Sequence, residues 1–272
     1  MPFNHEKLKV YQRTLLFNAA VYDWVSTWDR KHAICDHLPR AAEGVLDSIV
    51  AASAAYSAMK AKNLDYALGS VLECAACLDL ARVKHLLDST TITAHKRELA
   101  ELLRMLIGLR QSWTSSILRE LDAPYGQGSE RPLPKLQEAI PDILFHHEKL
   151  DAYAVAMHVA ELFSSSQFAQ NLGIAPYRRL DKLLTSIVLN IAEGNGRFSV
   201  ADHRRFLTIS HEAAGKLAAR IDLHAVQKSL PLSDIESWKA LLLRVSEMTA
   251  AMIVRLEARG SAADDAEGCD GG

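Results

Sequence analysis

Apolar side chains recur at three- and four-residue spacing along most of the chain, which predicts amphipathic helices. The clearest apolar faces run through residues 8–25, 99–113, 206–221 and 235–256. No alternating run of Val, Ile and Thr bounded by turn residues indicates a strand. A narrow apolar face of this kind is typical of helices that pack side by side at about 20° in a bundle.

The chain contains an internal repeat. FNHEKL at residues 3–8 recurs as FHHEKL at residues 145–150, and SIV at residues 48–50 recurs at residues 186–188. A period of about 140 residues is too long for a solenoid repeat and indicates duplication of a whole domain.

The two halves are separated by residues 122–142, DAPYGQGSERPLPKLQEAIPD, whose prolines and glycines oppose a continuous helix. The sequence therefore predicts an all-α fold of two tandem antiparallel up-down four-helix bundles. We expect a first bundle over residues 1–121, a linker over 122–142, a second bundle over 143–258 and a disordered acidic tail over 259–272.

Charge and composition narrow the classes of function. With 272 residues, 49% of them hydrophobic and 24% charged, the chain can bury two helical cores. Its net charge of −2 argues against coating nucleic acid by bulk charge. Residues 1–130 carry 15 basic and 15 acidic side chains, whereas residues 131–259 carry 16 and 14. Any contact with nucleic acid therefore has to use a local patch.

The sequence predicts a cytoplasmic protein that does not span a membrane. Its N-terminus lacks the apolar core and cleavage site of a signal peptide, and no apolar run approaches about 18 residues. Four cysteines do not form a disulfide framework in a chain of this size.

The most specific text is SIVLNIAEGNGR at residues 186–197, followed by RFLTI at residues 205–209. It resembles the bacterial four-helix bundle family that includes the rRNA intervening-sequence proteins and Avd, the accessory protein of diversity-generating retroelements. The first half has AASAAY at residues 51–56 where the second has LNIAEG. The resemblance implies a homo-oligomer that binds nucleic acid and a reverse transcriptase. Its signature positions are Asn190, Glu193, Gly194 and Gly196.

Six basic residues of the second half are candidate phosphate contacts, because an arginine fork donates two hydrogen bonds at once. They are Arg178, Arg179, Lys182, Arg197, Arg204 and Arg205. The alternative is that they are solvated helix-end charges paired with Asp181, Asp202 or Glu193, and the sequence leaves both interpretations open. Asn190 and Glu193 share a helix face, and we expect them to close the helix end. Gly194 and Gly196 are expected where that helix ends in a left-handed residue.

No catalytic residue, metal site or cofactor is expected. The chain has no H-E-x-x-H, P-loop, G-x-S-x-G or dinucleotide fingerprint. Cys74-x-x-Cys77 lacks two further zinc ligands and is interpreted as two buried small residues. His146 and His147 are interpreted as part of an exposed helix start.

Two hypotheses follow. The leading one is a non-catalytic, Avd-like accessory protein that contacts the phosphates of RNA or DNA and partners a reverse transcriptase and its template RNA. The competing one is a helical protein–protein interaction or self-assembly module with no nucleic-acid role.

Overall fold

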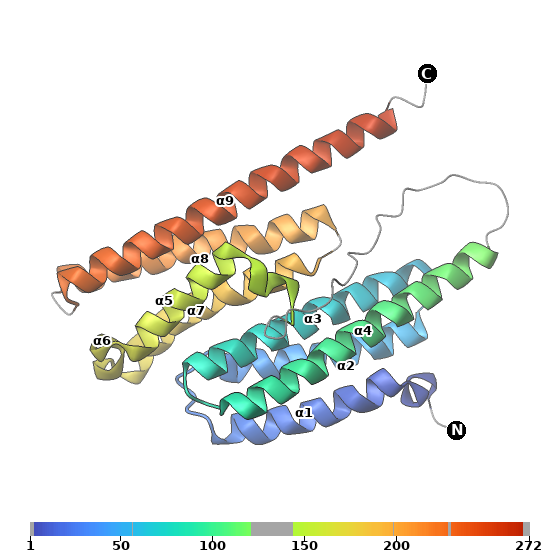
Figure 1. Ribbon diagram of the computed structural model, residues 1–272, viewed down its shortest axis with the longest axis horizontal. Helices are drawn as coiled ribbons and strands as arrows, with labels where there is room; N and C mark the ends of the chain where they lie inside the picture. Colours follow the sequence, from blue (N-terminus) through green and yellow to red (C-terminus); the bar gives the residue numbers. More distant parts are fainter. Residues whose placement is uncertain (1–2, 56, 121–143, 198, 228–229, 269–272) are drawn as a thin grey trace.

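A computed structural model describes residues 3–55, 57–120, 144–197, 199–227 and 230–268. Every regular element in these ranges is a helix, which confirms the all-α prediction (Figure 1). The expected linker over residues 122–142 lies outside the described residues.

The first half forms a bundle in which each long helix contacts two neighbours. α1 packs on α2, α2 on α3 and α3 on α4. α4 also contacts α1, so the four helices form a closed up-down bundle. The elements are η1 (Asn4–Lys7), α1 (Lys9–Thr27), α2 (Ile34–Ala54), α3 (Ser57–Val83) and α4 (Ser89–Glu120).

The second half repeats this layout, with α5, α7, α8 and α9 packed in the same cyclic order. Its first long helix is interrupted before Ser166, whose hydroxyl caps α6 by accepting a hydrogen bond from the Ala169 N–H at 3.1 Å. The elements are η2 (His146–Lys149), α5 (Asp151–Ser165), α6 (Gln167–Asn171), α7 (Ile174–Asn195), α8 (Val200–Val226) and α9 (Leu232–Gly268).

The last helix is longer than the sequence predicts. α9 continues through Gly268, ten residues beyond 258, into the segment that was expected to be a disordered tail. That segment contains Ala262, Ala263 and Ala266. Alanine has the highest helix propensity, so these residues favour extension of a helix that is already formed, despite Gly260.

α3 is the helix on which the two bundles meet. It contacts α2 and α4 within its own bundle, and α5 and α7 of the second bundle (Figure 1). Cys74 and Cys77 are fully buried, as are Ala75 and Ala76 between them, because this part of α3 is covered on every side. Burial raises the pKa of both thiols well above the usual value, which keeps them protonated. One hydrophobic core runs through both bundles.

Within the described residues, no helix has the length and apolar character needed to cross a membrane.

Candidate nucleic-acid interface

The signature text at the end of α7 lies against α3 of the first bundle. The Arg197 side chain is only 7% exposed and pairs with Glu193 one turn earlier. Its guanidinium carbon lies 4.8 Å from the centre of the Phe206 ring and 5.4 Å from that of Tyr66 on α3. Arg197 Nη1 also donates to the Asp65 carbonyl at 3.4 Å. The structure thus places Arg197 as a clamp between the bundles.

The glycines of this region make room for that contact. A Cβ on Gly69 of α3 would lie 2.7 Å from the Arg197 guanidinium carbon, and one on Gly196 would lie 2.1 Å from Leu72 Cδ1. A Cβ on Gly194 would lie 3.0 Å from Phe206 Cβ. The expected left-handed helix end is wrong for Gly196, whose φ is −88°. Close packing, rather than backbone conformation, requires glycine here.

Asn190 and Glu193 are engaged within α7. Asn190 Nδ2 donates to the carbonyl of Ser186 at 2.7 Å and approaches its hydroxyl at 3.1 Å. Burial raises the pKa of Glu193, and the nearby Glu73 adds to this shift, while Arg197 opposes it. Both signature side chains therefore have local partners at the helix end.

The start of α7 brings together cations from both bundles. Arg178 pairs with Asp36 at 2.6 Å and donates to the carbonyl of Arg30 at 3.0 Å. Lys31 lies with its Nζ 5.3 Å from the centre of the Tyr177 ring. The sequence did not point to Arg30 and Lys31, because they join this group only through the packing of one bundle on the other.

Three cations of this group are exposed, namely Arg30, Arg179 and Lys182. None of them has an acidic partner within 4.0 Å in the described part of the chain. Arg179 and Lys182 lie three residues apart on α7 and therefore share a helix face. We call Arg30, Arg179 and Lys182 the junction cations.

Arg204 and Arg205 lie at the other end of α7, near the start of α8. Arg204 pairs loosely with Glu257 at 3.4 Å, and both side chains are about half exposed, at 51% and 52%. The exposed Arg205 has its guanidinium carbon 4.7 Å from the centre of the Phe206 ring. α7 rises about 24 Å between residues 179 and 195, so the six predicted residues form two separate groups.

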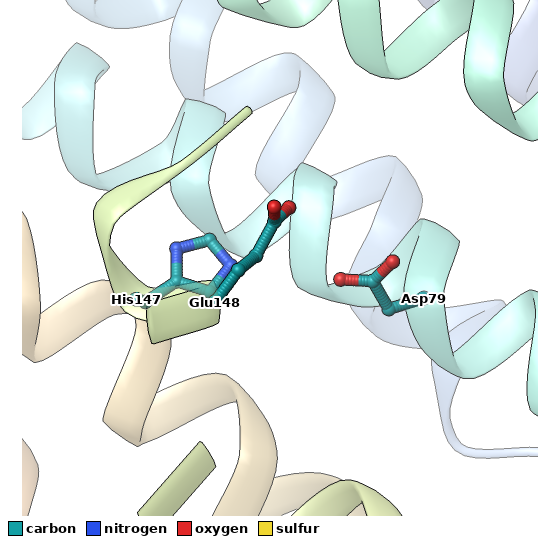
Figure 2. A group of neighbouring side chains, drawn as sticks. All are labelled: Asp79, His147 and Glu148. Atoms are coloured by element: carbon teal, nitrogen blue, oxygen red, sulfur yellow. The ribbon is translucent and has the colours of Figure 1, made fainter. Parts of the chain in front are cut away.

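A polar cluster joins the bundles beside α3, and Figure 2 shows three side chains of this region, Asp79, His147 and Glu148. The Lys96 ammonium of α4 lies 2.6 Å from both Asp79 Oδ1 of α3 and Glu148 Oε1 of η2. The Tyr153 hydroxyl of α5 donates to Asp79 Oδ2 at 2.9 Å. The cluster therefore has one ammonium between two carboxylates that come from different bundles.

The donor atoms of Asp79, His147 and Glu148 lie within 4.8 Å of one another, as a metal site requires. The cation between the two carboxylates is, however, the Lys96 ammonium. His147 is fully buried, so the expectation of an exposed helix start is wrong for this residue, because η2 packs on α5 and α7. Burial lowers the pKa of His147 to about 3, and neither ring nitrogen has a hydrogen-bond partner.

A cavity of about 490 Å³ opens next to this cluster between the bundles. Three cations line it, namely Arg82, Lys96 and Arg97, and the second bundle contributes Tyr153 and Met157. Arg82 and Arg97 are exposed. Positive side chains thus border the junction between the bundles at more than one place.

Comparison with known proteins gives one match. Residues 6–108 match the family model described as 23S rRNA-intervening sequence protein, which confirms the resemblance found in the sequence. The match falls on the first bundle, the half that lacks the LNIAEG text. No curated protein and no solved structure matches the chain.

Proposed function

We propose that this protein is a non-catalytic nucleic-acid-binding accessory protein. The observation that carries the proposal is the match of residues 6–108 to a family named for an rRNA intervening sequence. In this proposal the joined bundles form a rigid scaffold, and exposed cations on it contact phosphates. Such contacts give affinity with little sequence preference.

The junction cations are the best candidates for these contacts. Arg30, Arg179 and Lys182 are exposed and free of acidic partners in the described residues, so they bind a phosphate without first breaking an ion pair. Arg204 and Arg205 provide a second contact point at the opposite end of α7.

Arg178 and Arg197 support the interface indirectly in this proposal. Arg178 is held by Asp36, and Arg197 by Glu193. Their role is to fix the two bundles relative to each other, which sets the spacing of the exposed cations.

The finer form of the proposal is an Avd-like function in a diversity-generating retroelement. The SIVLNIAEGNGR text at residues 186–197 supports it. In that case the RNA is the template of a reverse transcriptase, the enzyme is a partner, and the protein acts as an oligomer in the cytoplasm.

The second candidate is a protein-interaction module without a nucleic-acid role. The net charge of −2 favours it, because a nucleic-acid-binding domain usually has a clear excess of positive charge. Under this hypothesis the exposed cations serve only to keep the surface solvated.

A salt titration separates the two candidates. Binding of the purified protein to labelled single-stranded and duplex RNA is measured by fluorescence anisotropy between about 50 and about 200 mM salt. We expect binding at low salt that weakens steeply as salt rises. Absence of binding at the lowest salt would favour the interaction module, whose partner would then be sought by pull-down.

A further inference from the structure

His147 is a fully buried imidazole without a hydrogen-bond partner. The residue is 0% exposed, and in the described part of the chain neither ring nitrogen is hydrogen-bonded. Burying a polar group without a partner costs free energy, so such a side chain points to a ligand that it meets. Two carboxylates lie close to the ring. The donor atoms of His147, Asp79 and Glu148 are within 4.8 Å of one another (Figure 2).

Each of these carboxylates has one oxygen held by the protein and the other directed at a cation. Asp79 Oδ2 accepts a hydrogen bond from the Tyr153 hydroxyl at 2.9 Å. Glu148 Oε2 accepts one from the Leu144 N–H, also at 2.9 Å. The remaining oxygens, Asp79 Oδ1 and Glu148 Oε1, both lie 2.6 Å from the Lys96 ammonium. Hydrogen bonds to the second oxygen are what orients the carboxylate ligands of a metal ion.

The Lys96 ammonium matches this position only in part. It donates a hydrogen bond to Asp79 Oδ1, whereas its contact with Glu148 Oε1 lacks hydrogen-bond geometry. One ammonium also carries a single positive charge against two carboxylates whose side chains are only 6% and 11% exposed. A divalent ion would balance both buried charges and would in addition bind the lone pair of the imidazole.

We propose that Asp79, His147 and Glu148 bind a divalent transition-metal ion, with Zn²⁺ preferred, in exchange for the Lys96 ammonium. Zn²⁺ binds imidazole nitrogen and carboxylate oxygen at about 2.0–2.2 Å. Two ligands at that distance are about 3.4 Å apart in a tetrahedral site, so the three donor atoms close by about 1 Å. Mg²⁺ and Ca²⁺ bind this group weakly, because they prefer oxygen ligands throughout.

The cavity beside the cluster gives room for the exchange. Its volume is about 490 Å³, and Lys96 lines it together with Asp79 and Glu148. The displaced ammonium extends into this space and is hydrated there, and a water molecule from the cavity completes the fourth position on the ion. The exchange thus requires movement of side chains and no rearrangement of helices.

The ligands come from both bundles, which gives the ion a structural role. Asp79 belongs to α3 of the first bundle, whereas His147 and Glu148 belong to η2 of the second. An ion that binds only the assembled site shifts the folding equilibrium toward it. Bound Zn²⁺ therefore stabilises the contact between the bundles.

The second bundle supplies a matched control. Lys239 and Asp222 form a similar pair, with an Nζ–Oδ1 distance of 2.6 Å. Their side chains are 41% and 53% exposed, and in the described residues Asp222 belongs to no group of three metal ligands. Lys239→Gln therefore removes the same kind of ammonium without opening a metal site.

The test measures Zn²⁺ binding to the full chain by competition with a chromophoric chelator. Wild-type protein is expected to bind one Zn²⁺ ion more than His147→Phe does, and Mg²⁺ is expected not to compete. Lys96→Gln removes the resident positive charge and is expected to bind Zn²⁺ at least about tenfold more tightly than wild type. A Lys96 that served only the ion pairs would give no such gain.

His146→Phe, at the exposed neighbouring position, and Lys239→Gln are expected to bind Zn²⁺ as the wild type does. Circular dichroism verifies the helix content of every variant. Zn²⁺ should raise the melting temperature of the wild type but not that of His147→Phe.

The proposal is overturned if wild type and His147→Phe bind the same number of Zn²⁺ ions, or if folded Lys96→Gln binds no more tightly than wild type. Should Lys96→Gln not fold, the comparison of His147→Phe with His146→Phe decides alone.

Discussion

The ammonium group of Lys84, in the first bundle, pairs with the carboxylate of Asp181, in the second, and neither side chain is exposed. Asp181 Oδ2 also accepts a hydrogen bond from the Ala33 N–H at 2.7 Å. A buried charge is stable only when a partner compensates it, and here the partner belongs to the other bundle. This relationship couples the folding of the two halves and fixes the junction on which the proposed interface lies.

Removing one member of this pair should therefore be costly. We expect Lys84→Met to lower the free energy of unfolding by about 3–5 kcal/mol, because it leaves the Asp181 carboxylate buried without compensation. Urea denaturation followed by circular dichroism measures the change. The double variant Lys84→Met, Asp181→Leu removes both charges and should regain most of the loss. A single variant as stable as the wild type would contradict this account of the junction.

Arg197 provides a second test of the junction. Arg197→Lys keeps the charge but loses the planar fork and its stacking on Phe206 and Tyr66. We expect a loss of about 1–3 kcal/mol, because Glu193 is left imperfectly paired while partly buried. RNA binding at a temperature where the variant is folded should stay within about twofold of wild type, since Arg197 only positions the bundles.

Arg204→Lys is the control for that experiment. The Arg204 side chain is 51% exposed and its pair with Glu257 is loose, so we expect a change in stability below about 0.5 kcal/mol. If the two substitutions had equal effects on stability, the role of Arg197 as a clamp would be refuted.

Stability should fall in mildly acidic solution. Burial lowers the pKa of His32 to about 4 and that of His147 to about 3, from 6.5. Below pH 6.5 the unfolded chain binds protons that the folded protein does not, so the free energy of unfolding decreases as pH falls. The decrease continues to about pH 4 for His32 and about pH 3 for His147, with a slope of at most about 1.4 kcal/mol per pH unit for each histidine.

Urea denaturation at pH 7, 6 and 5 measures that slope. His147→Phe should reduce the slope, because it removes one of the two buried histidines. The fold should be kept, because the His147 ring makes no hydrogen bond that phenylalanine would lose. His146→Phe, at an exposed neighbouring position, should leave the slope as in the wild type. A slope that is identical in all three proteins would show that His147 is not a buried neutral group.

The sequence predicted the helices and their grouping well, because both depend on local periodicity and on the duplicated text. Ile235 and Leu242, taken from the apolar face of the last helix, are both buried. The contact between the bundles could not be predicted from the sequence, since no local pattern encodes which face of α3 meets α7. For that reason, His147 and Arg178 were interpreted only in terms of the second half, although both lie near the contact between the bundles.

The same limit applies to the candidate site. The arginine pattern proposed Arg179 and Lys182 together with Arg178 and Arg197. Pairing of Arg197 with Glu193 was one of the two interpretations that the sequence left open, whereas Asp36, the partner of Arg178, was not considered. Arg178 pairs with a residue 142 positions away in the sequence. Arg30 was missed for the same reason, since its nearness to α7 arises only when the bundles dock.

The central claim is that the junction cations contact nucleic acid. The most direct measurement is the salt dependence of single-stranded RNA binding for a triple variant, Arg30→Gln, Arg179→Gln and Lys182→Gln. The control has the same loss of charge at three exposed cations of α8 and α9, namely Lys216→Gln, Arg220→Gln and Arg244→Gln.

At about 0.7 for each lost phosphate contact, we predict that the slope of log K against log salt becomes shallower by about 2 in the junction variant only. Its affinity at low salt should fall at least about tenfold, while the control stays near wild type. Equal losses of affinity in the junction variant and the control would contradict the account, because they would mean that binding follows net charge and not this site.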